Sequence, residues 1–235
     1  MHSGVKAVMS WSGGKDSALA LYKMLNDSKY AVKELFTTYN TQYNRVSIHG
    51  VRKELMKKQA ELIGLPVHFI ALEGNSYAEY ESKMSDYLNG LAKRGITHVI
   101  YGDIFLEDLK NYRDAELKKH GLKGVYPLWK QDTKKIVSQF LKEGFKTYVC
   151  AVNLDKLSED FLGLLLNEGF LERLPENVDF CGENGEFHTF CFDGPLFKSP
   201  LSIVKGKKYI VSYFLKEKEV KTGYIDLLLN QCTRN

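Results

Sequence analysis

The sequence of 235 residues has only 4 cysteines and 5 prolines, and it contains no C-x-x-C pair. This spacing therefore predicts free thiols in a reducing compartment rather than a disulfide framework. The four residues are Cys150, Cys181, Cys191 and Cys232. No apolar run reaches the length of about 20 residues that a membrane-spanning helix needs. The first residues show no apolar signal-peptide core. These absences lead us to expect a cytoplasmic protein without a membrane partner.

Internal repeats, low-complexity segments and linkers rich in proline, glycine and serine are also absent. With 44% hydrophobic and 26% charged residues, the composition is that of a folded globular protein. The net charge of +4 permits an anionic ligand, but the lysines are spread along the chain and form no block. The length suits one α/β domain with an elaboration, or two small domains.

Strand patterns alternate with helix patterns over the first two thirds of the chain, which indicates parallel pairing through crossover connections. The predicted strands are residues 5–11, 32–39, 67–72, 97–102, 124–128 and 146–152. The predicted helices are residues 16–25, 51–63, 77–94, 106–120 and 133–143. Ligands of such sheets bind beyond the carboxyl ends of the strands. We expect a parallel-sheet α/β domain over residues 1–154.

The pattern changes near Asp155 and indicates a smaller C-terminal α+β lobe over residues 155–235. A helical pattern over residues 161–166 is followed by strand patterns at 187–192 and 201–204. Residues 207–215 and 220–224 are predicted to pair as a hairpin across residues 216–219.

The segment Ser12-Gly13-Gly14-Lys15-Asp16-Ser17 lies between the first strand and the first helix. Two adjacent glycines allow the backbone to adopt positive φ and to approach a ligand closely. The following helix N-terminus offers unpaired N–H groups and a favourable dipole to an anion. The segment therefore predicts a phosphate-binding turn rather than a glycine-rich turn without a nucleotide.

The spacing excludes the Walker-type loop, which needs four residues between its glycines and a Lys-Ser/Thr ending. Instead, the segment resembles the S-G-G-x-D-S loop of the PP-loop, or N-type ATP pyrophosphatase, superfamily, whose fold is of the adenine nucleotide alpha hydrolase type. The resemblance implies that ATP is cleaved between its α and β phosphates. It also implies that the loop holds pyrophosphate, with donors from Ser12, Lys15 and Ser17, and that Asp16 helps to hold Mg²⁺. Ser10, Gly13, Gly14 and Gly102 complete the expected ATP-binding set.

Further segments resemble the diphthine–ammonia ligase family over essentially the whole chain. They are Ile48-His49-Gly50-Val51-Arg52, Gly102-Asp103-Ile104, Tyr112-Arg113, Pro127-Leu128-Trp129 and the run from Cys181 to Thr189. The first and the last of these look closer to a bacterial-type branch, and we expect no counterpart of the extra C-terminal domains of the eukaryotic enzymes.

The resemblance implies a reaction in which ATP adenylates the carboxylate of diphthine, a modified histidine on elongation factor 2. Ammonia then displaces AMP to give the amide. ATP and Mg²⁺ are the expected cofactors, and a homodimer is the assembly considered for this chain. A different carboxylate, such as one met in cobalamin salvage, is the alternative acceptor.

Asp103 follows a predicted strand and could hold Mg²⁺, orient the acceptor, or simply cap the next helix. Arg113 could neutralise a phosphate or a carboxylate, or form an exposed ion pair. His49 and Arg52, near a predicted helix start, could contact phosphate or acceptor, or lie on the surface.

The run Glu183-Asn184-Gly185-Glu186-Phe187-His188-Thr189 is the richest polar cluster of the second half. We expect it to bind the acceptor, with Glu186 and His188 orienting ammonia or handling its proton, although a solvated turn would look similar. Cys181, His188 and Cys191 could ligate zinc, but their spacing matches no standard site. Trp11 and Trp129 could stack on adenine or belong to the core.

Two other function classes are open at this stage. A tRNA-modifying PP-loop enzyme would need paired catalytic cysteines or an appended RNA-binding domain, and neither is evident, so we expect no nucleic-acid partner. A nucleotide sensor without catalysis would not need both the lysine and the aspartate of the loop. An ATP-dependent amide-forming ligase is the favoured function.

Overall fold

The computed structural model describes residues 4–46, 49–74, 76–215 and 218–230. Ile48 and Cys232, which the sequence analysis considered, and residues 216 and 217 of the predicted turn at 216–219 lie outside these residues. Within the described part of the chain, no helix has the length and apolar character needed to span a membrane.

The first sheet contains five of the six strands predicted for it, and these five are parallel. They are β1 (Val5–Ser10), β2 (Tyr30–Asn40), β4 (Val67–Leu72), β5 (His98–Ile100) and β6 (Lys123–Val125), and the short β3 (Arg45–Val46) pairs antiparallel with β2. β2 lies on one side of β1, and β5 and β6 lie on the other. The strand order therefore reverses between β1 and β5, and ligands of open α/β sheets bind at such a switch point.

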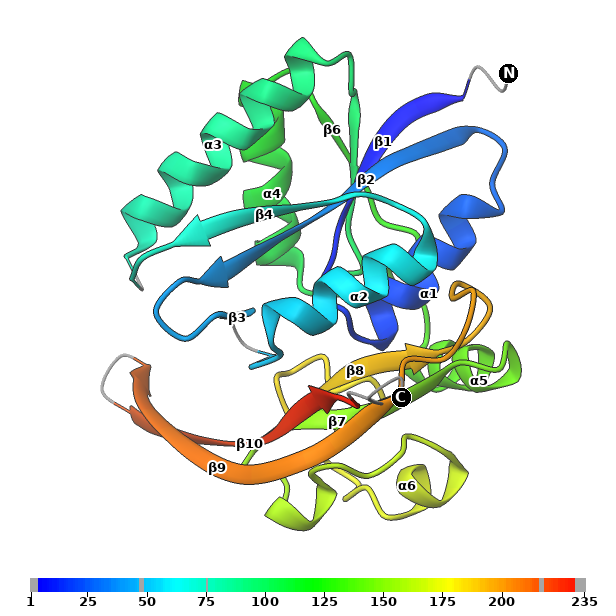
Figure 1. Ribbon diagram of the computed structural model, residues 1–235, viewed down its shortest axis with the longest axis vertical. Coiled ribbons are helices and arrows are strands. Elements are labelled where there is room, and N and C mark those ends of the chain that lie inside the picture. Colours follow the sequence, from blue (N-terminus) through cyan, green and yellow to red (C-terminus); the bar gives the residue numbers. More distant parts are fainter. Residues whose placement is uncertain (1–3, 47–48, 75, 216–217, 231–235) are drawn as a thin grey trace, which may run out of the picture.

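Helices cover both faces of this sheet (Figure 1). They are α1 (Lys15–Leu25), α2 (Lys53–Ile63), α3 (Tyr77–Lys93) and α4 (Glu107–Lys119), whereas α5 (Thr133–Lys142) lies beside the second sheet described below. Local signals set their ends: the Asp132 carboxylate caps α5 by accepting from the Lys135 N–H at 3.1 Å, and Gly64 ends α2 with a φ of 83°. In Figure 1, α1 and α2 lie between the first sheet and a second sheet, whereas α3 and α4 cover the opposite face.

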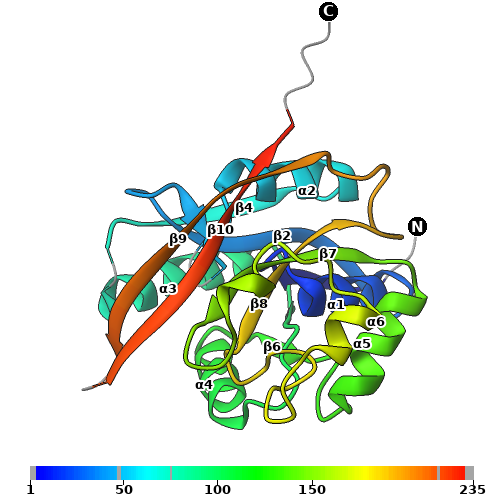
Figure 2. The same ribbon diagram turned by 90° about the horizontal axis from the view of Figure 1, so that it is seen from below.

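The second sheet is antiparallel, with the order β8-β7-β10-β9. Its strands are β7 (Lys146–Asn153), β8 (Phe187–Asp193), β9 (Ile203–Leu215) and β10 (Lys218–Leu229). The predicted hairpin is confirmed, since Val220 pairs with Tyr213, and Figure 2 shows β9 and β10 running side by side. The smaller antiparallel lobe is thus present as expected.

Two sequence-based expectations are wrong. β7 was predicted to continue the parallel sheet, but it pairs antiparallel with β8 and β10, because its apolar residues are buried against the second lobe. The helix expected at residues 161–166 is absent: a 3-10 turn at Glu159–Phe161 ends before Gly163, whose φ of 80° is incompatible with a helix. A helix, α6 (Glu168–Glu172), follows instead. The division after residue 154 stays a prediction, and the pairing of β7 favours an earlier one.

The two sheets share a buried core, because side chains of α1, α2 and both sheets form one apolar cluster. A separate cluster lies under α3 on the other face of the first sheet. Polar ties join the lobes as well: the carboxylate of Asp226 in β10 accepts hydrogen bonds from Arg45 at 2.9 Å and from Arg52 at 2.9 and 2.6 Å. The second lobe is therefore fixed against the edge of the first that carries the predicted phosphate loop.

Candidate active site

The predicted phosphate loop connects β1 to α1, and its glycines are tightly surrounded. Gly13 has a φ of 77°, and a Cβ there would lie 2.8 Å from the side chains of Met56 and Gln59. A Cβ on Gly14 would lie 2.9 Å from the carbonyl oxygen of Thr189. Backbone conformation requires glycine at the first position, and contact with β8 requires it at the second.

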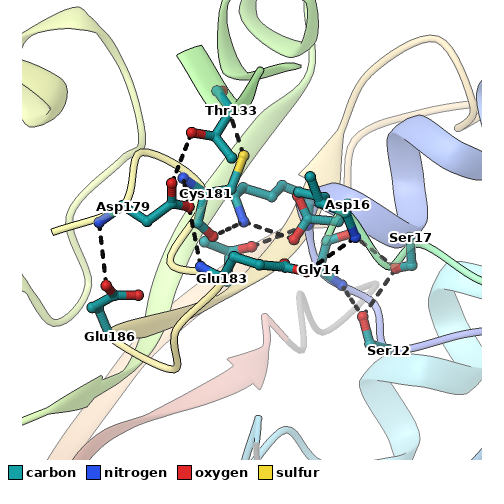
Figure 3. Close-up of polar contacts among 12 residues, drawn as sticks. Ser12, Gly14, Asp16, Ser17, Thr133, Asp179, Cys181, Glu183 and Glu186 are labelled. Carbon is teal, nitrogen blue, oxygen red and sulfur yellow. Dashed lines mark hydrogen bonds and ion pairs between the residues drawn. The ribbon is translucent and has the colours of Figure 1, made fainter. Parts of the chain in front are cut away.

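The loop serines hold the turn together. Ser17 Oγ donates to the carbonyl oxygen of Gly14 at 2.9 Å, and Ser12 Oγ donates to Ser17 Oγ at 3.1 Å (Figure 3). The Gly14 N–H also points to Ser12 Oγ at 3.3 Å. Ser10, the last residue of β1, is partly buried directly before the turn. The structure therefore brings the predicted ATP-binding residues of this segment into one turn at the switch point.

Lys15 is buried, with 3% of its surface exposed. Its ammonium group donates to Asp16 Oδ2 at 2.7 Å and to the carbonyl oxygen of Cys181, and it lies 5.4 Å from the ring centre of Phe187. Burial acts to lower the pKa of Lys15, but the charge of Asp16 and its hydrogen bond outweigh burial and raise the pKa. The lysine is therefore a permanent cation that links the loop to the second lobe.

Asp16 has one carboxylate oxygen without a partner. Oδ2 binds Lys15, whereas Oδ1 is buried and has no hydrogen-bond partner within the described part of the chain. Burial raises the pKa of this carboxyl, and the Lys15 ammonium opposes the shift. A buried carboxylate oxygen without a donor at a phosphate loop suits a divalent cation.

No cluster of three or more His, Cys, Asp or Glu side chains among the described residues could hold a metal by itself. This finding covers Cys181, His188 and Cys191, the zinc ligands considered above. Mg²⁺ needs no such cluster in a nucleotide site, since it is commonly bound by one or two carboxylates, substrate phosphates and water. The single oxygen of Asp16 fits that kind of site.

Asp179 organises the loop that faces the phosphate turn, and sequence reasoning missed it. Its Oδ1 accepts from the N–H groups of Cys181 at 2.8 Å and Glu183 at 3.2 Å, and its Oδ2 accepts from Thr133 Oγ1 at 2.7 Å (Figure 3). An aspartate that accepts from the backbone two residues later is a recurrent turn motif, so Asp179-Phe180-Cys181 carried a local signal. This turn presents the Cys181 carbonyl oxygen to Lys15.

Glu186 lies inside the same loop and is 1% exposed. Its carboxylate accepts from the Asp179 N–H at 3.2 Å and from the N–H and side-chain amide of Asn184 at 3.0 and 3.2 Å. Asn184 and Gly185 are exposed at the tip of the turn. These contacts direct the Glu186 carboxylate into its own loop, where it orders the turn.

Glu183 reaches from this loop to the segment after β5. Its Oε1 accepts from the N–H groups of Ile104 at 3.0 Å and Phe105 at 3.3 Å. Burial, with the charge of Asp16 adding to it, raises the pKa of Glu183 to about 7 although the two N–H groups oppose the shift. Glu183 therefore joins its loop to the segment after β5 and can hold or release a proton near neutral pH.

The segment after β5 also touches the phosphate loop. A Cβ on Gly102 would lie 3.0 Å from the backbone of Asp16 and Ser17, so a larger residue there would push the two segments apart. Next to it, the carboxylate of Asp103 is ion-paired with Arg113, and the Arg113 guanidinium lies 4.3 Å from the ring centre of Tyr101. Burial raises the pKa of Asp103, and Arg113 opposes the shift. This pair borders the switch point beside the loop.

His49 and His188 come together although they lie far apart in the sequence. Their ring centres are 4.7 Å apart, and His49 Nδ1 lies 3.2 Å from the carbonyl oxygen of Thr189. Thr189 Oγ1 accepts from the Lys15 N–H at 3.0 Å. The predicted cluster of the second half therefore meets the phosphate loop through β8.

The other residues considered from the sequence form contacts away from the phosphate turn or in the core. Arg52 is the residue before α2, and its guanidinium binds Asp226 of the second lobe. Trp11 is 1% exposed and donates to the Gln59 side chain at 2.9 Å, which makes it a core residue. Trp129 is partly buried beside Tyr126.

Gln59 is a second residue that sequence reasoning missed. It is 0% exposed, and its amide nitrogen donates to the carbonyl oxygens of Gly13 at 3.0 Å and Cys191 at 2.6 Å. Its amide oxygen accepts from the Trp11 ring. A glutamine within the amphipathic pattern of α2 carries no signal of this role, because its partners come from β8 and the loop.

Two family models match the chain, and together they cover most of it. The one described as the diphthamide synthase N-terminal domain matches residues 5–124, and the one described as the diphthamide synthase C-terminal domain matches residues 132–222. Their limits leave β7 in the C-terminal part, together with the sheet to which it belongs.

Relatives named diphthine–ammonia ligase are similar over 221 residues. The Danio rerio protein is 30% identical, and the match covers 82% of this chain and 84% of that protein. The Mus musculus protein is 25% identical, with 82% and 80% covered. The Schizosaccharomyces pombe protein is 27% identical, and the match covers 86% of this chain but only 36% of that longer protein.

A solved structure, the U34-tRNA thiolase NcsA from Methanococcus maripaludis, is similar over 59% of this chain and 58% of its own, with 16% identity and a TM-score of 0.37. This distant likeness carries no argument about function. The two family models and the Danio rerio relative show the family, since they span both lobes described above. The chain therefore belongs to the diphthamide synthase family, whose members matched here are diphthine–ammonia ligases.

Proposed function

We propose that the protein is an AMP-forming carbon–nitrogen ligase, which uses ATP to activate a carboxylate and ammonia to convert it to an amide. The acceptor that we propose is diphthine, a modified histidine on elongation factor 2, in line with the names of the relatives. A carboxylate of another molecule, such as one met in cobalamin salvage, is the alternative acceptor. The place in a bacterial-type branch, the cytoplasmic location and a homodimer stay predictions.

The observation that carries the proposal is the loop at the switch point. Ser12, Gly14 and Ser17 form a tight turn at the start of α1, and the adjacent Lys15 is a buried cation. N–H groups at a helix N-terminus together with a buried cation suit the charge of a pyrophosphate group. We therefore propose that this turn holds the β and γ phosphates of ATP, which leave together.

Mg²⁺ fits beside this turn, because Asp16 Oδ1 is a buried carboxylate oxygen without a donor. Asp16 would hold the ion together with the phosphates, and the ion would neutralise part of their charge. Asp103 and Arg113 lie at the same edge. We propose that this ion pair borders the acceptor carboxylate, with Arg113 as the group that orients it.

Activation as an adenylate explains why the second lobe closes over the loop. A free carboxylate is a poor acyl donor, whereas an acyl-adenylate releases a stabilised phosphate. The adenylate must be shielded from water so that ammonia attacks instead. The 179–186 loop lies across the edge of the sheet that carries the phosphate turn. It is held there by the contacts of Lys15 with Cys181 and of Glu183 with Ile104, which supports a shielding role.

Sulfur transfer to tRNA, the main alternative in the superfamily, finds little support in the described cysteines. Cys150, Cys181 and Cys191 are all buried. Burial raises the pKa of the Cys150 thiol to about 12, and it raises those of the other two thiols further. Reactive cysteines are instead exposed, with a lowered pKa.

The proposal is tested by the products that form from ATP, Mg²⁺, ammonium and acceptor. We expect AMP and pyrophosphate, and we expect Lys15→Ala and Asp16→Asn each to lower turnover at least tenfold, equivalent to about 1.4 kcal/mol of transition-state stabilisation. Asp108→Asn, in the exposed first turn of α4, is the matched control and should retain full turnover. ADP and orthophosphate as the main products would refute the proposal.

A further inference from the structure

His49 and His188 form a pair of imidazoles at the junction of the two lobes. Their ring centres are 4.7 Å apart, with an angle of 42° between the ring planes. His49 Nδ1 lies 3.2 Å from the Thr189 carbonyl oxygen, which can only accept a hydrogen bond. Nδ1 must therefore carry the proton of a neutral ring, and Nε2 is left as an acceptor.

The pair lies directly against the phosphate turn. A Cβ on Gly14 would be 3.1 Å from His49 Cε1, and the Thr189 hydroxyl accepts the Lys15 N–H. His188 precedes Thr189 in β8, so its position is set by the same strand. Both rings are partly buried rather than sealed off from solvent. A small molecule held by the rings would therefore lie beside the nucleotide loop.

The surroundings keep both rings neutral. Burial lowers the pKa of His49 to about 4, with Lys15 adding to the effect and the Thr189 carbonyl opposing it. Burial, His49 and Lys15 lower the pKa of His188. Within the described part of the chain, neither ring is hydrogen-bonded to a carboxylate that would make it a stronger base. Each neutral imidazole offers one nitrogen as an acceptor.

From this geometry we propose that His49 and His188 together bind the ammonia that attacks the acyl-adenylate, each through its unprotonated ring nitrogen. The inference rests on the proposed function and assigns its second substrate to a site. Two neutral acceptors bind the N–H groups of ammonia and leave its lone pair free for attack. The nearby Lys15 cation disfavours a second cation, which selects ammonia over ammonium.

In the reaction step, the ammonia lone pair forms the C–N bond at the activated carbonyl carbon. The C–O bond to the adenylate breaks, and its electron pair leaves with the AMP phosphate. The nitrogen loses one proton, which passes to that phosphate, because burial and the Lys15 cation disfavour a proton on either imidazole. The histidines position ammonia and return unchanged.

The test separates ammonia from the nucleotide. His49→Ala and His188→Ala should raise the KM for ammonium at least tenfold, while the KM for ATP and acceptor-dependent exchange of pyrophosphate into ATP stay within about twofold of wild type. His49→Asn and His188→Asn keep a neutral hydrogen-bond acceptor, so they should raise the KM for ammonium less than the alanine variants do. His120→Ala, at the partly exposed end of α4, is the control and should change nothing.

The outcomes are distinct. An unchanged KM for ammonium in folded alanine variants with normal exchange would overturn the ammonia site but leave the proposed function intact. Loss of exchange in both the alanine and the asparagine variants would show that the pair serves the nucleotide or the acceptor instead. Wild-type protein that forms neither AMP nor amide would refute the proposed function itself, and this inference with it.

Discussion

Asp226→Asn tests how firmly the second lobe is held on the first. The Asp226 carboxylate accepts three hydrogen bonds, one from Arg45 at 2.9 Å and two from Arg52 at 2.9 and 2.6 Å. The two arginines enclose the segment that carries His49. Replacing the carboxylate by an amide keeps its shape and one acceptor oxygen, but it removes the charge between two guanidinium groups.

The size of the effect follows from burial. Hydrogen bonds to charged groups contribute about 1.5–3 kcal/mol each when they are protected from water. The side chains of Asp226 and Arg45 are 16% and 22% exposed, but that of Arg52 is 38% exposed, so solvent screening discounts its two bonds. We expect a loss of about 2 kcal/mol in the free energy of unfolding. For a chain of this size, that loss lowers Tm by about 4–8 °C.

The effect depends on pH with a definite sign. The hydrogen bonds from Arg52, with the one from Arg45, outweigh burial and hold the pKa of Asp226 below its ordinary value. A carboxyl with a lowered folded pKa stabilises the protein above its unfolded pKa of about 4. This stabilisation is lost as the pH falls through the folded pKa. The difference between wild type and Asp226→Asn should therefore be full at pH 7 and shrink below about pH 4.

Thermal unfolding of both proteins from pH 3 to pH 8 measures this difference, with Asp108→Asn as an exposed control. A variant whose Tm stays within 1 °C of wild type at pH 7 would refute the idea that the ion pair joins the lobes. A difference that is as large at pH 3 as at pH 7 would show that its origin is not the carboxylate charge.

Two further predictions concern the site. Gly14→Ala should weaken binding of a non-hydrolysable ATP analogue at least tenfold in calorimetric titration, since its Cβ would lie 2.9 Å from the Thr189 carbonyl oxygen. Unchanged affinity would contradict this packing. Glu183 has a folded pKa raised to about 7, so its ionisation destabilises the fold as the pH rises from about 4.5 to 7. Glu183→Gln should remove that slope from urea-unfolding free energies, and an unaltered slope would exclude this group as its source.

Local patterns in the sequence determined most elements of the first sheet and the phosphate turn. The strand Val67–Leu72 was predicted to the residue, because a short apolar run between turn residues has one local interpretation. The loop from Ser12 to Ser17 was predicted because adjacent glycines before a helix pattern restrict the backbone conformation within a few residues.

Only the tertiary structure decided which segments meet. β7 has the apolar pattern of a buried strand, and that pattern cannot distinguish a parallel neighbour from the antiparallel β8 and β10. Several contacts of the site likewise join residues that are distant in the sequence. They include those of Asp179 and Gln59, the pairing of Arg52 with Asp226, and the contact of His49 with His188. The sequence by itself therefore predicted the nucleotide-binding turn, because that turn is one contiguous segment. Packing of the two lobes decided the rest of the site, because hydrogen bonds and burial depend on distances in space and not along the chain.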